Sequence, residues 1–181
     1  MTFKEVVSAN KGVIFFLLRF LVVFAGLSLA YGAWIQSYGD IPDPISWFIA
    51  DTLAWLNQPH VRLEAAVGTP AILLYYDEKQ VISVFDGCNG IAVMILFFAF
   101  IIAFRGSAVN TLWFTVAGIL FIHMANIGRL QLLLSLAKED NAELFHFMHK
   151  YLFTLIIYVS VFILWVIWIR FFALIRKRRN E

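Results

Sequence analysis

The sequence predicts an all-α integral membrane protein, a four-span helical bundle in a single membrane domain that covers residues 1–181. Hydrophobic residues make up 62% of the chain and charged residues only 14%, whereas soluble domains contain about 45–50% and about 25%. A membrane helix needs about 20 apolar residues, so the chain has room for four or five spans. The net charge of +2 at pH 7 gives no indication of nucleic-acid binding.

Four stretches meet the length of a membrane span, and a long polar segment separates the first two. We expect spans over residues 13–35, 88–104, 109–134 and 149–175, with an outer segment at 36–87. The second span is short at the apolar level, but we expect residues 87–90 (Gly-Cys-Asn-Gly) to extend it into the interface. The first span is longer than the apolar core of a secretory signal, which has about 7–15 residues. We therefore expect the first span to be retained.

Basic residues predict how the spans are oriented. Lysine and arginine in short flanks are held on the cytoplasmic side of a membrane. In a four-span arrangement, one side receives every basic flank, namely Lys4, Lys11, Arg105 and the run 176–179. The segment 36–87 on the other side is mainly acidic. We expect a multi-pass protein of the cytoplasmic (inner) membrane with both termini in the cytoplasm.

The outer segment contains signals for local structure. Asp43 followed by Pro44 is a typical helix start, and apolar residues then recur at helical spacing. Trp47 and Trp55 favour a helix that lies in the outer interface, which would be the fifth helix of the protein. The runs 71–76 and 81–85 are rich in β-branched and aromatic residues and predict a short hairpin with its turn at 77–80. This hairpin would bring the chain back to the membrane surface.

Several reactive or charged side chains are predicted to meet at that surface. Cys88 is the only cysteine in the chain and directly precedes the second apolar run. Arg129 lies near the outer end of the third span, and Asn126 shares its helical face because three residues separate them. His146 and His149 precede the fourth apolar run. A thiol, a guanidinium and imidazoles from three spans therefore fall at one level of the membrane.

This combination has a chemical interpretation. A cysteine becomes a nucleophile when histidine takes its proton or a nearby positive charge favours the thiolate. A fixed cation can then stabilise the oxyanion formed when the thiolate attacks an amide. The alternative is that each residue is ordinary at an interface: a buried cysteine, an arginine anchor and interfacial histidines. His123, in the middle of the third span, is expected to be a packing residue.

Three short motifs, in order along the chain, resemble those of a known family. Cys-Asn-Gly-Ile begins at Cys88, Asn-Ile-Gly-Arg-Leu surrounds Arg129, and a histidine precedes the next span. This order resembles the exosortase and archaeosortase family, whose first motif is usually Cys-Ser-Gly or Cys-Ala-Gly and whose second is Asn-x-x-Arg. Here Asn89 replaces the small middle residue, and Phe153 stands where many members have glycine. The short length and the stretch 145–153 look most like the compact exosortase F type of Bacteroidetes, over roughly residues 85–170.

The resemblance implies a membrane-embedded cysteine transpeptidase. Its substrate would be a membrane-anchored protein with a C-terminal sorting signal, made of a short motif, an apolar helix and a basic tail. The enzyme would cut at the motif on the outer face of the membrane and pass the acyl group to an acceptor. The implied partners are therefore this substrate, the lipid bilayer and the acceptor. The chemistry needs neither a metal nor an organic cofactor.

The resemblance also assigns roles to residues. Cys88 would be the nucleophile, Arg129 the oxyanion stabiliser or thiolate partner, and His149 the general acid and base. His146 remains an alternative to His149, because the two lie three residues apart on one helical face. Asn126 would orient Arg129, and Asn89 would assist near the thiol.

Other interpretations make different demands on the chain. A thiol oxidoreductase would need paired cysteines, and the chain has one. The main alternative to an enzyme is a non-enzymatic multi-span accessory or assembly protein, in which Arg129 and the histidines only join helices through hydrogen bonds.

Overall fold

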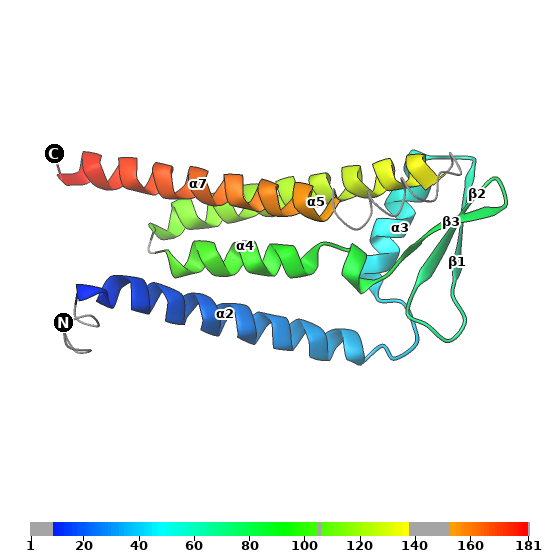
Figure 1. The fold of residues 1–181 in the computed structure, drawn as a ribbon, viewed down its shortest axis with the longest axis horizontal. Helices are drawn as coiled ribbons and strands as arrows, with labels where there is room; N and C mark the ends of the chain where they lie inside the picture. Colours follow the sequence, from blue (N-terminus) through cyan, green and yellow to red (C-terminus); the bar gives the residue numbers. More distant parts are fainter. Residues whose placement is uncertain (1–8, 105, 138–152, 181) are drawn as a thin grey trace.

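The computed structural model describes residues 9–104, 106–137 and 153–180 of the chain. Long helices lie side by side in a bundle, and a short helix and a small sheet cover one end of it (Figure 1). The helices are α2 Lys11–Gln36, α3 Pro44–Leu56, α4 Ile91–Ala103, α5 Ala108–Ala137 and α7 Phe153–Asn180, and the strands are β1 Val61–Ala65, β2 Ile72–Tyr76 and β3 Lys79–Val84. A 3-10 turn, η1 Asp86–Cys88, joins β3 to α4.

Long helices overlap the four stretches predicted as spans, and their ends differ from the predicted ones. In the described residues, α2 and α5 are each long and apolar enough to cross a membrane, whereas α4 and the apolar part of α7, Leu155–Phe171, are shorter. Helix α4 begins at Ile91, three residues after the predicted start of the second span at 88, because η1 occupies that position. Helix α5 continues three residues beyond the predicted end at 134. The predicted start of the fourth span, at 149, lies outside the described residues.

Helix α4 lies at the centre of the bundle, with α2 on one side and α5 and α7 on the other (Figure 1). Phe97 of α4 is fully buried and packs against Gly118 of α5, where a Cβ atom would clash with the ring. Phe100 of α4 stacks on Trp165 of α7, with 4.3 Å between ring centroids. Small residues allow close approach of membrane helices, so glycine at position 118 sets the spacing of α4 and α5.

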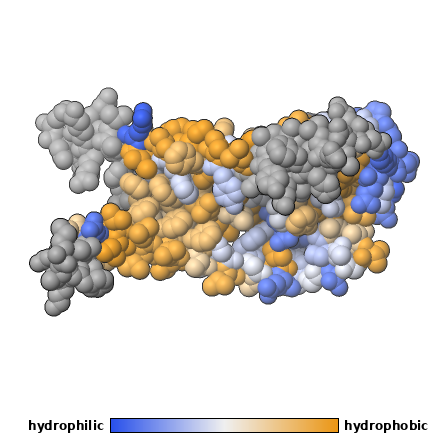
Figure 2. Space-filling model, in the orientation of Figure 1, coloured by the Kyte–Doolittle hydropathy of each residue, from blue (hydrophilic) through white to orange (hydrophobic). Residues whose placement is uncertain are grey.

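The surface of the molecule divides into two regions. Hydrophobic residues cover the helical bundle, and hydrophilic residues gather over the end that carries the sheet (Figure 2). The N-terminal end of α2, the connection from α4 to α5 and the C-terminal end of α7 lie at the opposite end (Figure 1). The helix ends next to the predicted basic flanks are therefore at one end of the molecule, away from the sheet.

The outer segment forms more β-structure than the sequence predicts. The hairpin of β2 and β3 is present, but β1 pairs antiparallel with β2 and completes a three-stranded sheet in the order β1-β2-β3. The expectation of an all-α protein with a short hairpin is therefore wrong by one strand. The β2–β3 turn is also tighter than predicted: only Asp77 and Glu78 form it, with φ of 46° and 66°. Two residues with positive φ are typical of a type I′ hairpin turn.

A hydrophobic core at this end joins the sheet to α3 and to the outer end of α5. Its buried members come from all three elements and include Ile49, Leu74, Val84, Leu130 and, at the edge of the bundle, Cys88 itself. Helix α3 begins as predicted, because the Asp43 carboxylate accepts hydrogen bonds from the N–H groups of Ile45 and Ser46. This core fixes where β3 ends and therefore where η1 and its cysteine lie.

Candidate active site

Cys88 is the last residue of η1, between the end of β3 and the start of α4. Its backbone N–H donates a hydrogen bond of 2.7 Å to the carbonyl of Phe85, which closes the turn. The side chain is only 4% exposed, since it belongs to the outer hydrophobic core. The thiol is therefore held in one place and shielded from solvent.

Asn126 of α5 holds the backbone of this turn. Its side-chain amide donates a hydrogen bond of 2.8 Å to the carbonyl oxygen of Cys88, and the side chain is 1% exposed. Gly90 makes this approach feasible for two reasons. Its φ of +79° is in the left-handed region, and a Cβ atom there would lie 3.2 Å from Cγ of Asn126. The glycine that follows the cysteine thus lets α5 come close to the turn.

Arg129 lies one helical turn after Asn126 on the same face of α5, and its guanidinium lies close enough to the Cys88 thiol to interact with it electrostatically. The guanidinium is partly buried, and its Nε has no hydrogen-bond partner among the described residues. The structure therefore brings the cysteine and the arginine into contact, as the sequence predicts. The free Nε is a donor still available in a buried position.

The electrostatics of the site leave the thiol in need of a base. Burial raises the pKa of the Cys88 thiol above that of an exposed cysteine, while the hydrogen bond with the Phe85 backbone and the positive charge of Arg129 act in the opposite direction. The nearby Asp86 carboxylate adds to the increase. Because desolvation is the largest of these effects, the thiol rests in its neutral form until a base removes the proton.

Two predicted supporting residues have partners that differ from the expectation. Asn126 was expected to orient Arg129, but its amide hydrogen bond goes to the Cys88 carbonyl. Asn89 was expected to assist near the thiol, but its amide N–H donates to the hydroxyl of Tyr31 at 2.7 Å. Its amide oxygen accepts from the N–H of Ile91 at 3.0 Å. Asn89 therefore satisfies the first N–H of α4 and ties the turn to α2.

Tyr31 is a residue of this site that the sequence analysis missed. It lies in the outer part of α2 and is the acceptor for the Asn89 amide. The sequence contained one signal for it: a tyrosine hydroxyl near the end of an otherwise apolar span. Such a hydroxyl usually has a hydrogen-bond partner on another part of a membrane protein. Its partner could not be deduced from spacing, since 58 residues separate it from Asn89.

The histidines have two different outcomes. His146 and His149 lie outside the described residues. His123 packs as expected, since its ring stacks on that of Phe48 from α3 with 5.8 Å between centroids. Within the described ranges, no group of three or more His, Cys, Asp or Glu residues could hold a metal ion.

The fold and the site together define an integral membrane protein with a buried, arginine-paired cysteine at the end of its helical bundle. The family model for transmembrane exosortases matches residues 7–166. The chain therefore belongs to the transmembrane exosortase family, and the match includes the first span and the outer segment, beyond the region of resemblance at 85–170. A search of curated proteins and a search of solved structures each found no match.

Proposed function

We propose that this protein is a membrane-embedded cysteine transpeptidase that cleaves the C-terminal sorting signal of exported proteins and transfers them to an acceptor through a thioester. The observation that carries the proposal is the contact between the Cys88 thiol and the Arg129 guanidinium, in a chain of the transmembrane exosortase family. A cation beside a buried thiol favours the thiolate and can then stabilise an oxyanion.

The proposal includes a topology. Four helices cross the inner membrane, both termini are cytoplasmic, and the sheet, α3 and Cys88 are on the outer side. The position of the helix ends supports this arrangement, because the predicted basic flanks adjoin the end of the bundle away from the sheet (Figure 1). Helix α4 has 13 residues, or about 20 Å. This length is shorter than the hydrocarbon core of a membrane, so the turns at the two ends of α4 lie below the headgroup surfaces, and the site lies there too.

The substrate enters as an apolar helix from the lipid side. The bilayer then positions the peptide bond that precedes this helix near the outer surface, which removes much of the search for orientation. The same apolar helix and its basic tail become the leaving fragment.

In the first half of the reaction, His149 takes the proton from Sγ of Cys88, and the thiolate attacks the carbonyl carbon of the scissile peptide. Arg129 stabilises the oxyanion, in which the new carbon–sulfur bond coexists with the carbon–nitrogen bond. The carbon–nitrogen bond then breaks, and His149 returns its proton to the departing amine. The product is a thioester between Cys88 and the exported protein.

In the second half, an amine or hydroxyl acceptor attacks the thioester and transfers its proton through the same histidine. The carbon–sulfur bond breaks, and the thiol of Cys88 is restored. If water is the acceptor, the reaction is a proteolysis. His146 takes the place of His149 in an alternative form of the same mechanism.

Covalent trapping tests this proposal. A tagged reporter carries the C-terminal sorting segment of an exported protein from the same organism, and it is co-expressed with wild-type enzyme or with Cys88→Ala, Arg129→Ala, His146→Ala or His149→Ala. The expected result is an enzyme–reporter adduct that hydroxylamine cleaves, that is lost with Cys88→Ala and that requires one histidine. No adduct, with normal cell phenotype and protein abundance for Cys88→Ala but low abundance for Arg129→Ala, would replace the enzyme with an accessory protein.

A further inference from the structure

Strand β3 leads directly into the candidate site. Among the described strands it is an edge strand, because the sheet order is β1-β2-β3 and β3 pairs with β2 alone of these. Its last residue, Val84, precedes Cys88 by four positions, and η1 occupies the interval. Any chain that lies along the outer edge of β3 is therefore guided toward the thiol.

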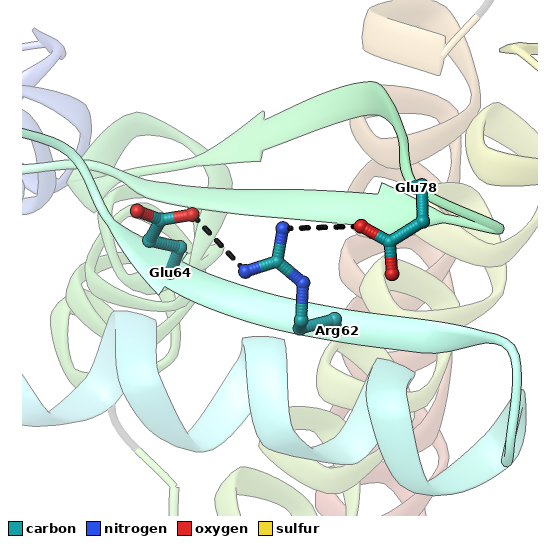
Figure 3. A network of polar contacts seen from close by, with 3 residues as sticks. All are labelled: Arg62, Glu64 and Glu78. Carbon is teal, nitrogen blue, oxygen red and sulfur yellow. Dashed lines mark hydrogen bonds and ion pairs between the residues drawn. The ribbon is translucent and has the colours of Figure 1, made fainter.

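The two edges of the sheet differ in charge. On β1, Arg62 forms ion pairs with Glu64 at 3.3 Å and with Glu78 at 3.6 Å, and all three side chains are exposed (Figure 3). Charged side chains protect an edge strand from pairing with another chain. Residues 80–84 of β3 contain no charge and no proline. This stretch therefore lacks the protection that β1 has.

No described residue outside β2 pairs with the backbone of residues 80–84. The ladder skips Val81, since Leu74 pairs with Ile82 and Tyr75 pairs with Gln80. A bulge of this kind is frequent beside active sites, where it changes the direction of a strand. The regular edge nearest the site is residues 82–84, about 10 Å long, and Phe85 follows it directly.

The side chains along this edge alternate as a recognition strand requires. Ile82 and Val84 are buried in the outer core, whereas Ser83 is exposed and Phe85 is 41% exposed. The Phe85 ring also packs over Gly87, where a Cβ atom would lie 2.5 Å from it. The exposed surface of Ser83 and Phe85 thus extends to the turn that holds Cys88.

We propose that the substrate segment immediately before the scissile bond binds as an added fourth strand on the outer edge of β3. This inference rests on the proposed function, which supplies an exported domain followed by an apolar helix. Strand β3 runs from the β2–β3 turn, at the far end of the sheet, toward the bundle (Figure 1). The substrate runs in the same direction, from its exported domain to its membrane helix, so the added strand is parallel to β3. Main-chain hydrogen bonds supply the affinity, and Ser83 and Phe85 contact alternate substrate side chains.

Two measurements on the reporter described above test the added strand. In the first, the photo-crosslinking residue p-benzoylphenylalanine replaces Ser83 on β3 or, as a control, Glu64 on β1, which is also exposed. Illumination should link the reporter to position 83 through residues that precede the scissile bond, and leave position 64 without a crosslink. Thioester formation is measured in the same samples.

In the second measurement, proline replaces each reporter residue before the scissile bond in turn. Proline cannot donate the backbone hydrogen bond of a strand. In a parallel ladder, alternate residues of the added strand bond to β3, so thioester formation should fall by about five- to tenfold at every second position. The wild-type enzyme is used throughout, so its folding is constant.

Each outcome has a separate meaning. A crosslink at position 83 together with a two-residue period in the proline scan supports the added strand. A thioester that forms without either result overturns the added strand and leaves the transpeptidase intact. A crosslink from position 64 in place of 83 would move the binding site to β1 and also overturn the inference. Absence of any thioester refutes the proposed function itself.

Discussion

The hydrogen bond from Asn126 to the Cys88 carbonyl gives a quantitative prediction. In Asn126→Leu, the side chain keeps a similar volume, but the buried carbonyl of Cys88 loses its donor. An unsatisfied buried acceptor costs about 1–3 kcal/mol. The free energy needed to open the turn should fall by this amount. Opening should then be about 5- to 150-fold more frequent, at 1.36 kcal/mol for each factor of ten.

Alkylation of the thiol measures this opening. Cys88 is the only cysteine in the chain, so the rate at which N-ethylmaleimide modifies the protein reports on this residue alone. The thiol is 4% exposed in the native state, and the reagent therefore reacts mainly when the turn opens. We expect the alkylation rate of Asn126→Leu to rise by about 5- to 150-fold, while thioester formation with the reporter falls.

Gln131→Leu is the matched control. Gln131 and Asn57 exchange two side-chain hydrogen bonds, of 2.8 and 3.0 Å, which join α5 to α3 without touching the turn. Its loss should lower the stability of the protein by a similar amount and change the alkylation rate less than twofold. The argument fails if alkylation of Asn126→Leu matches the wild type. It also fails if both variants react faster to the same extent, because global unfolding then exposes the cysteine.

Three other predictions follow from the contacts described above. Burial raises the pKa of Cys88, so the midpoint of its alkylation rate against pH should lie above that of an exposed cysteine. The charge of Arg129 lowers this pKa, so Arg129→Met should move the midpoint to still higher pH, and an unchanged midpoint would contradict the contact between the two side chains. In Gly118→Ala the added methyl group would clash with a buried ring, so the free energy of unfolding should fall by about 1–3 kcal/mol. Thermal unfolding in detergent measures this change, and Gly26→Ala, with open space around the added methyl group, is the control that should lose no stability. Asp43→Ala removes the cap of α3 and should lower stability by about 1 kcal/mol in denaturant titration, and equal stability would show that the cap contributes little.

Much of the outer segment could be predicted because its signals are local. Asp43 and Pro44 define a helix start through capping chemistry that involves neighbours in sequence. The hairpin is visible as two runs of β-branched and aromatic residues. Strand β1 was missed because Arg62 and Glu64 make it polar, and its pairing with β2 is a property of the assembled sheet.

The ends of the second span and the turn before it were harder to predict. The sequence predicts that the stretch from Gly87 to Gly90 extends the second span, but Gly90 adopts a left-handed conformation that cannot continue an α-helix. Likewise, a type I′ turn with Glu78 at positive φ is unusual, since such positions favour glycine and asparagine. Conformations that run against local preference are determined by the packing around them.

For the candidate site, sequence spacing identified the right face of α5 but not the partner of each side chain. Asn126 and Arg129 share a face, as three-residue spacing predicts, and the cysteine lies against that face. That Asn126 bonds to a backbone carbonyl, and Asn89 to Tyr31, depends on the distance between three helices. These distances follow from contacts such as that of Gly118 with Phe97.

The position of Cys88 inside the outer hydrophobic core also has a consequence for the chemical lifetime of the protein. On the outer side of the membrane, where we place it, an accessible low-pKa thiol would be oxidised to sulfenic and then to irreversible sulfinic acid. Packing and a raised pKa keep Cys88 in the slowly oxidised thiol form until a substrate displaces the residues around it. If Cys88 is the nucleophile that we propose, the burial that makes it wait for a base would also preserve it on that side of the membrane.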